Sequence, residues 1–200
     1  GLALLVELFD WASRQFGLPP AMKDMRLIAG RATVQVRTLA GPLAAPAKWD
    51  GDVSVTPRLV RLTHPELPGE LRLDDGSVHG NLRALTAQGL KVEVLDAELR
   101  MGGTVSGLLG GEPRVEVQGT GPVGAKMLDW TWDRAGLREA IAPIHPFEAR
   151  SLSVKWPAEK GFEAAGELMF AGKTSVSFDA LVQLRAMQVR SIAVRDEYSD

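Results

Sequence analysis

The residues with the most suggestive chemical spacing are 119–124, Gly-Thr-Gly-Pro-Val-Gly, which match the G-x-G-x-x-G pattern of dinucleotide-binding turns. Glu139 follows at about the separation of a ribose-binding acid. A dinucleotide site needs successive parallel βαβ units, however, whereas the flanking sequence is typical of β-hairpins. Pro122 also lacks one of the amide donors that a pyrophosphate would use. The favoured interpretation is a turn in which glycines let a strand lead into a helix.

The other groups capable of catalysis or metal binding are scattered. His64, His79 and His145 are the only histidines, and none has a second histidine or a carboxylate at metal-ligand spacing. Ser106 lies among glycines whose offsets do not form the G-x-S-x-G turn of hydrolases. We therefore expect no catalytic residue, no metal and no cofactor, and predict that the protein is not an enzyme.

Adjacent acids and tryptophans offer two further possibilities. Asp74 and Asp75 could share a proton, but they precede Gly76, and Asp is common in tight turns, so a turn is favoured. The tryptophans could form a ligand platform, although core packing is the favoured interpretation. They are Trp11, Trp49, Trp130, Trp132 and Trp156.

The composition suits a folded chain, with 45% hydrophobic and 24% charged residues among 200. The formal net charge is -2 and the basic residues are interspersed with acids, so nucleic acid is not an expected partner. The absence of cysteine excludes disulfides and thiolate chemistry but leaves the compartment open. The apolar start at residues 2–6 is too short to span a bilayer and lacks the basic flank of an export signal.

An amphipathic helix is predicted over residues 4–16, because apolar residues recur there at spacings of three and four. They are Leu5, Leu8, Ala12 and Phe16. Gly17 and the two prolines after it end the helix. We expect residues 1–17 to form this N-terminal helix and residues 25–197 to form a single elongated β domain, as a fragment of a longer protein.

Beyond this helix the apolar period changes to two, which is the period of half-buried strands. The alternating pairs are Val34 and Val36, Val53 and Val55, Leu71 and Leu73, Val92 and Val94, Val115 and Val117, Leu152 and Val154, and Val176 and Phe178. Glycine-containing segments between them, including residues 74–77 and 102–103, are predicted to be hairpin turns. The strands should therefore pair antiparallel.

A short second helix is predicted near residues 125–140, where Leu128, Trp132 and Leu137 would line one side of residues 127–140. Two prolines then make residues 142–146 an extended connector. With so little helix, the predicted fold is mainly β. Either two sheets pack together as a sandwich or barrel, or one sheet curls and leaves an apolar trough.

Four stretches between residues 62 and 170 share a pattern of glycine, leucine and charge. They are residues 67–73 before Gly76, residues 90–99, residues 115–122 before the second helix, and residues 152–157 before the strand at 166–168. In this pattern the chain resembles the AsmA-like family of the Gram-negative envelope, which includes the TamB and YhdP types. The resemblance implies an elongated antiparallel sheet curled into a taco-like groove, in proteins thought to carry phospholipids between the inner and outer membranes.

On this resemblance the chain is a non-catalytic lipid-transfer segment that holds acyl chains by apolar contact. The expected groove residues are Val53, Val55, Leu71, Leu73, Val92, Val94, Val115, Val117, Leu152 and Val154. The expected partners are phospholipid or another acyl-chain lipid, and neighbouring segments of the same longer chain or envelope proteins. The expected location is the periplasm, with a tether to the inner membrane in a segment outside this chain.

The alternative is a protein-interaction module of an envelope assembly or secretion system. It would be a closed β-sandwich whose apolar faces meet and whose edge strands pair with a partner. The two hypotheses differ in whether the apolar face of the strands is covered by a second sheet.

Overall fold

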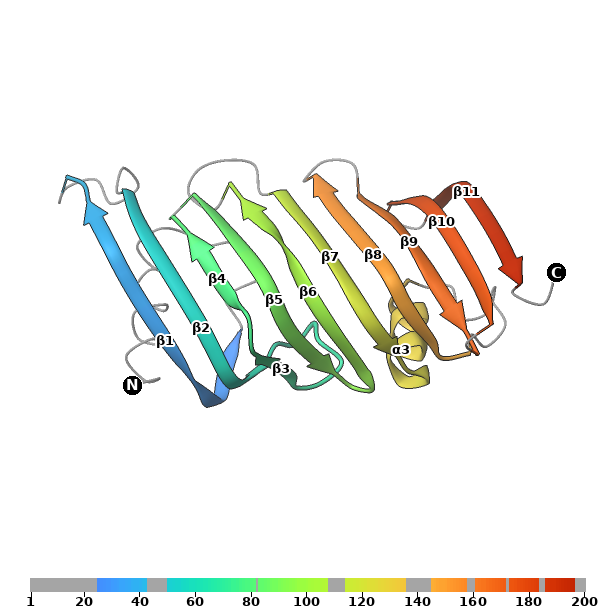
Figure 1. Ribbon diagram of the computed structural model, residues 1–200, viewed down its shortest axis with the longest axis horizontal. Helices are drawn as coiled ribbons and strands as arrows, with labels where there is room; N and C mark the ends of the chain where they lie inside the picture. Colours follow the sequence, from blue (N-terminus) through green and yellow to red (C-terminus); the bar gives the residue numbers. More distant parts are fainter. Residues whose placement is uncertain are drawn as a thin grey trace.

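A computed structural model describes residues 25–42, 50–81, 83–107, 114–135, 145–157, 161–171, 173–183 and 186–196. These residues form one antiparallel 11-stranded sheet and one helix, α3 (Ala125–Ala135) (Figure 1). The strands are β1 (Arg26–Ala40), β2 (Asp50–Thr63), β3 (Leu71–Asp74), β4 (Ser77–Gly80), β5 (Ala84–Val94), β6 (Ala97–Ser106), β7 (Arg114–Val123), β8 (Phe147–Pro157), β9 (Phe162–Phe170), β10 (Thr174–Gln183) and β11 (Ala186–Asp196). The prediction of a mainly β, antiparallel fold with one short helix is confirmed, whereas the predicted N-terminal helix lies outside the described residues.

The sheet is a meander in which sequence order and spatial order coincide. The hydrogen-bonded order runs β1-β2-β3-β5-β6-β7-β8-β9-β10-β11, and β4 follows β3 end to end in the same position between β2 and β5. Every pairing is antiparallel and local in sequence, as expected when each strand returns along its predecessor. The strand contacts are those between sheet neighbours, so within the described residues no second sheet packs on this one.

The prediction of a hairpin turn at residues 74–77 is wrong. β3 and β4 both pair with β2 and with β5, so they are two halves of one interrupted strand. Asp75 and Gly76 have φ values of 54° and 65°, which kink the chain without reversing it. The glycine is needed because a Cβ at residue 76 would lie 2.5 Å from the Gln88 carbonyl oxygen on β5.

The predicted turn at residues 102–103 is also wrong, because both glycines lie inside β6. A Cβ on Gly103, which has φ 151°, would lie 2.2 Å from the Glu116 carbonyl oxygen on β7. Glycine is therefore needed at residue 103 because the backbones of β6 and β7 approach closely there. The chain reverses instead at Leu95 and Asp96, a two-residue connection that joins the paired ends of β5 and β6.

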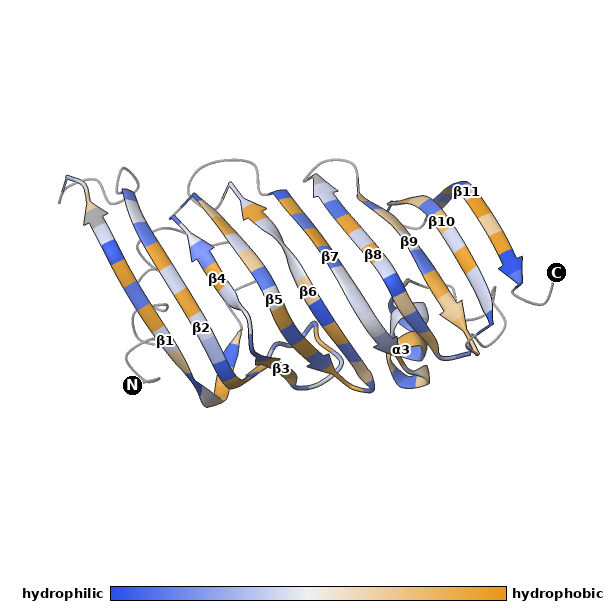
Figure 2. Ribbon diagram, in the orientation of Figure 1, coloured by the Kyte–Doolittle hydropathy of each residue, from blue (hydrophilic) through white to orange (hydrophobic). Residues whose placement is uncertain are grey.

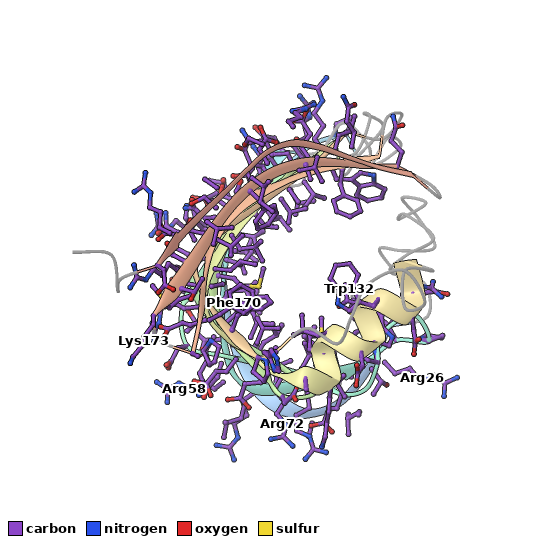
Figure 3. All side chains as sticks on the ribbon, turned by 90° about the vertical axis from the view of Figure 1, so that its right-hand side faces the viewer. Arg26, Arg58, Arg72, Trp132, Phe170 and Lys173 are labelled. Carbon is purple, nitrogen blue, oxygen red and sulfur yellow. The ribbon has the colours of Figure 1, made fainter. Side chains whose placement is uncertain are left out.

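The alternation of side chains slips by one residue at bulges in several strands. Register shifts occur beside Gly30 and Leu59 where β1 meets β2, and at Gly89 in β5. Arg150 in β8 and Arg190 in β11 are likewise extra residues between two paired positions. Bulges bend the strand that carries them. Viewed along its long axis the ribbon of the sheet is bent, with charged side chains on the outside of the bend (Figure 3).

The register separates the side chains into an apolar face and a charged face. Orange and blue residues alternate along the strands in Figure 2, and cross-strand partners share a face. Phe170 lies on the inside of the bend, while Arg58, Arg72 and Lys173 project outward (Figure 3). We use the term apolar face for the side that carries Phe170 and charged face for the side that carries Arg58.

Few side chains are fully buried, as expected for a single layer. The buried hydrophobic residues among those described are Val60, Ala97, Val123, Leu128, Ala149, Met169 and Ala180. None of the described large side chains is completely enclosed, and no described polar residue is buried. The described sheet therefore has no extensive packed core, and its stability comes from the hydrogen bonds between strands together with partial burial of its apolar side chains.

Two alanine substitutions test whether the strand glycines are needed for close approach. Gly89→Ala meets no atom within 4 Å but forces alanine to φ 62°, which should cost about 1–2 kcal/mol. Gly103→Ala adds a clash with backbone and should cost about 3 kcal/mol or more. Urea unfolding measures both, and equal losses for the two variants would refute the close-approach explanation.

Candidate functional site: the apolar face of the sheet

The register places all ten predicted groove residues on one face. Val53 and Val55 lie opposite Gly80 and Val78, whose β5 partners continue the same face. Farther along the sheet, Val117 lies opposite Val154. The remaining cross-strand pairs on this face are Leu71 with Val94, Leu73 with Val92, Val115 with Trp156, and Gly119 with Leu152. One continuous apolar surface therefore runs from β2 to β8.

The same face contains apolar residues that the sequence interpretation did not select. They are Leu85, Val105, Trp156, Phe147, Leu168, Phe170, Phe178 and Ile192. The bulges hid some of them, because the apolar positions change from odd to even numbers at Gly89 in β5 and from odd to even at Arg150 in β8. In the sequence, these bulges could have been recognised from the change of the apolar positions from odd to even numbers beside a glycine or an isolated charged residue.

Helix α3 covers one end of the apolar face. Leu128 is 7% exposed and packs with Ala97 and Val123 at the ends of β6 and β7. Partly buried hydrophobic residues surround this cluster: Val94, Leu99, Met127, Trp132 and Phe147. The helix was predicted over residues 127–140 and is described over Ala125–Ala135, with residues 136–144 outside the described chain.

Asp96, in the β5–β6 turn, fixes the start of α3. Its carboxylate accepts hydrogen bonds from the backbone N–H groups of Lys126 and Met127, each at 2.9 Å. Partial burial raises the pKa of Asp96, but these two donors, the backbone N–H of Asp96 itself and the charge of Lys126 together hold the pKa below its ordinary value. Gly124 is required here, since a Cβ would lie 2.3 Å from Asp96 Cγ. A distant turn thus supplies the helix cap that the local sequence lacks.

The other end of α3 is also tied down. Arg134, in the last turn, forms an ion pair with Glu66 in the connection between β2 and β3. Between these two anchors, Trp132 points toward the inside of the bend (Figure 3). Its indole N–H is shielded from solvent and has no hydrogen-bond acceptor among the described residues. A shielded donor without an acceptor is unfavourable and is a place where a ligand oxygen would be stabilised.

Away from α3 the apolar face retains exposed hydrophobic side chains. Trp156 on β8 is 44% exposed, and Ile192, on the edge strand β11, is 66% exposed. A depression of about 720 Å³ spans the middle of β5 to β9, and its lining combines Met101 and Leu152 from the apolar face with Gln118 and Ser153 from the charged face. Gly119 also lines it. Because glycine has no side chain, the backbone is accessible there.

The glycine motif of β7 has a structural explanation. A Cβ on Gly121 would lie 2.2 Å from the Glu98 carbonyl oxygen, so this glycine allows β6 and β7 to approach. The first amide groups of α3, which would bind phosphate in a dinucleotide fold, already donate to Asp96. The predicted connection between a strand and a helix is present, since β7 ends at Val123 and α3 begins at Ala125.

The remaining candidate residues do not come together. His64 Nδ1 accepts a hydrogen bond from the Glu66 amide, His79 lies in β4, and Ser106 ends β6. Asp74 accepts a hydrogen bond from the Leu59 amide, which stabilises the bulge of β2. Among the described residues no group of three His, Cys, Asp or Glu side chains is arranged to hold a metal ion.

Comparisons with known proteins add no identification. No protein-family model, curated protein or solved structure significantly matches the chain. Within the described part of the chain, no helix has the length and apolar character needed to cross a bilayer.

The Asp96 cap predicts a pH-dependent stability. Asp96→Ala should lower the free energy of unfolding by about 0.5–2 kcal/mol at pH 7. Because the folded pKa of Asp96 is depressed, the stabilisation is complete above the unfolded pKa of about 4 and is lost as pH falls below it. The difference between wild type and Asp96→Ala, measured by urea unfolding, should therefore shrink as the pH falls below about 4 and through the folded pKa. A difference that is unchanged at low pH would contradict the charged cap, and Asp96→Asn, which keeps one acceptor, is the matched control.

Proposed function

We propose that this protein is a non-catalytic lipid-binding segment that holds phospholipid acyl chains on the apolar face of its curved sheet. The observation that carries the proposal is a continuous apolar face in a single-layered sheet, covered at one end by α3. Exposed apolar surfaces of this extent are typical of ligand or partner sites. In the proposed complex the bend of the sheet makes this face a groove.

The energetics of acyl-chain binding suit such a surface. Each buried methylene contributes about 0.8 kcal/mol, so about 5 to 19 methylenes offset an association cost of roughly 4–15 kcal/mol. No polar recognition of the chain is needed. The opposite face carries charges that keep the loaded protein in water, including Lys155 and Glu116 at 2.6 Å and Arg190 and Glu163 at 2.9 Å.

The end covered by α3 would hold the polar part of the lipid. The unpaired indole N–H of Trp132 can donate to an ester carbonyl or phosphate oxygen, which are acceptors that an acyl chain alone lacks. The tail would then extend along the apolar face away from α3, past Leu152 toward Val154 and Trp156 on β8. This arrangement accounts for a helix at one end of the face and exposed apolar residues at the other.

The resemblance to AsmA-like proteins extends the proposal to the cell. A periplasmic location, tethering to the inner membrane by another segment, and transfer of phospholipid between the two membranes would follow from it. The edge strands β1 and β11 suit continuation of the sheet by neighbouring segments or envelope proteins, since within the described residues each pairs with a strand on one side alone.

A matched pair of substitutions on β7 tests lipid binding. Val117 lies on the apolar face away from the α3 cluster, and Gln118, the next residue, is exposed on the charged face. Val117→Asp should reduce the phospholipid that co-purifies with the protein at least tenfold, because a carboxylate would be desolvated against the acyl chain. Gln118→Asp should leave it within twofold. Lipid is quantified by mass spectrometry of solvent extracts, and folding by circular dichroism.

Two outcomes would contradict the proposal. One is lipid at control-protein levels in folded wild type, and the other is equal retention by folded Val117→Asp and Gln118→Asp. Val94 is a poorer test position, because it packs against the α3 cluster and its replacement would also disturb the fold.

A protein-interaction module is the second candidate, supported by the edges of the sheet. Val36 on β1 and Val194 on β11 are 55% and 63% exposed, and both edge strands could accept an added strand. The closed sandwich predicted for this alternative is not formed by the described residues, which build one sheet. A folded, lipid-free wild-type protein would favour this candidate.

A further inference from the structure

Among the described residues, the charged face contains three places where two cations lie directly opposite each other on neighbouring strands. Like charges in this position repel and destabilise a sheet. In two of the three, carboxylates compensate. Arg61 faces Arg72, and Glu70 lies 2.8 Å from one guanidinium and 2.9 Å from the other.

The second compensated pair is on β5 and β6. Lys91 faces Arg100, and the ammonium group lies 2.9 Å from Glu93 and 3.0 Å from Glu98. Hydrogen bonds to Glu93 and Glu98 raise the pKa of Lys91. The fold therefore places anions beside cross-strand cation pairs on this face.

The third pair, Arg31 on β1 and Arg58 on β2, has no such anion. The two residues are direct cross-strand partners, and no carboxylate of the described chain lies within ion-pair distance of either. Protection of an edge strand could explain an arginine on β1. It does not explain Arg58, because β2 is an inner strand, with β1 on one side and β3 and β4 on the other.

The surroundings of this pair form a depression of about 850 Å³ on the charged face. Its lining includes Arg31, Arg58, Arg61, Arg72 and Lys91, with Asp74 and Glu93 as the acids. Leu59, at φ 50° in the bulge, also lines it and is 69% exposed. Positive charge exceeds negative charge in this lining, and Arg31 and Arg58 carry the part that no described carboxylate neutralises.

We infer that Arg31 and Arg58 bind a phosphate group in this depression. Each guanidinium presents a planar pair of N–H donors. Two guanidinium groups side by side therefore have more donors than the two oxygens of one carboxylate can satisfy. A phosphate has three or four oxygens and can accept from both arginines at once. The group could belong to free phosphate or to a phospholipid headgroup, and the two sources share this chemistry.

This site is independent of the proposed lipid groove, because it lies on the opposite face. Loss of phosphate binding through Arg58→Gln should leave co-purifying lipid unchanged, and Val117→Asp should leave phosphate binding unchanged. Failure of one proposal is thereby distinguishable from failure of the other.

The test uses sodium phosphate, and vesicles of phosphatidylglycerol or phosphatidylcholine, with wild type, Arg31→Gln, Arg58→Gln and Arg195→Gln. Arg195 is an exposed arginine on β11, outside the depression, so its variant is a matched control for the loss of one charge. Phosphate binding is measured as the rise in melting temperature in sodium phosphate relative to sodium chloride of equal ionic strength. Vesicle binding is measured by flotation. We expect wild type and Arg195→Gln to be stabilised by sodium phosphate more than by sodium chloride, or to float with phosphatidylglycerol vesicles and not with phosphatidylcholine vesicles. Arg31→Gln and Arg58→Gln should bind that probe at least tenfold more weakly.

The probes separate the sources. Stabilisation by phosphate beyond that by chloride indicates a site for free phosphate, and flotation with phosphatidylglycerol vesicles alone indicates a headgroup site. Equal effects of phosphate and chloride together with no vesicle binding would overturn the inference. So would unchanged binding by folded Arg58→Gln, or an equal loss in Arg195→Gln.

Discussion

The cross-strand register is the constraint on which the rest of this protein depends. Since the side chains of a strand alternate between faces, a shift of one residue in any pairing would move apolar residues to the charged side. Instead, pairs such as Val117 with Val154 keep apolar partners together. The ion pairs, such as Lys155 with Glu116, lie on the other face. With a single layer, this separation replaces the packed core that would otherwise stabilise the fold.

The bulges reconcile this register with a bent sheet. A strand that bends by inserting one residue would expose its apolar side chains unless the sequence changed phase at the same place. In β5 the apolar positions are Leu85 and Ala87 before Gly89, and Leu90 and Val92 after it, so sequence and backbone shift together. The kink at Asp75 and Gly76 lies against this bulge in the neighbouring strand. Local irregularity and long-range register are therefore matched in the sequence.

Much of this arrangement could be predicted from sequence, and the failures have physical causes. Alternation identified the strands, their antiparallel pairing and the ten residues that the register brings to one face. Residues 74–77 and 102–103 were misassigned because glycine serves close backbone approach as well as turns, and its neighbours do not reveal which. The cap of α3 was missed because Asp96 is distant in sequence from Lys126, which it binds. Whether a second sheet covers the apolar face could not be decided either, since alternation is the same in a sandwich and in a single layer.

Photocrosslinking tests most directly whether acyl chains lie on the apolar face. Phosphatidylglycerol carrying a diazirine in its acyl chain would be incubated with the protein, irradiated, and the adducts located by peptide mass spectrometry. We predict adducts at apolar-face residues of β7 and β8, such as Val117, Leu152 and Val154. Adducts confined to charged-face neighbours such as Gln118 and Ser153, or labelling no greater than that of a control protein, would contradict it.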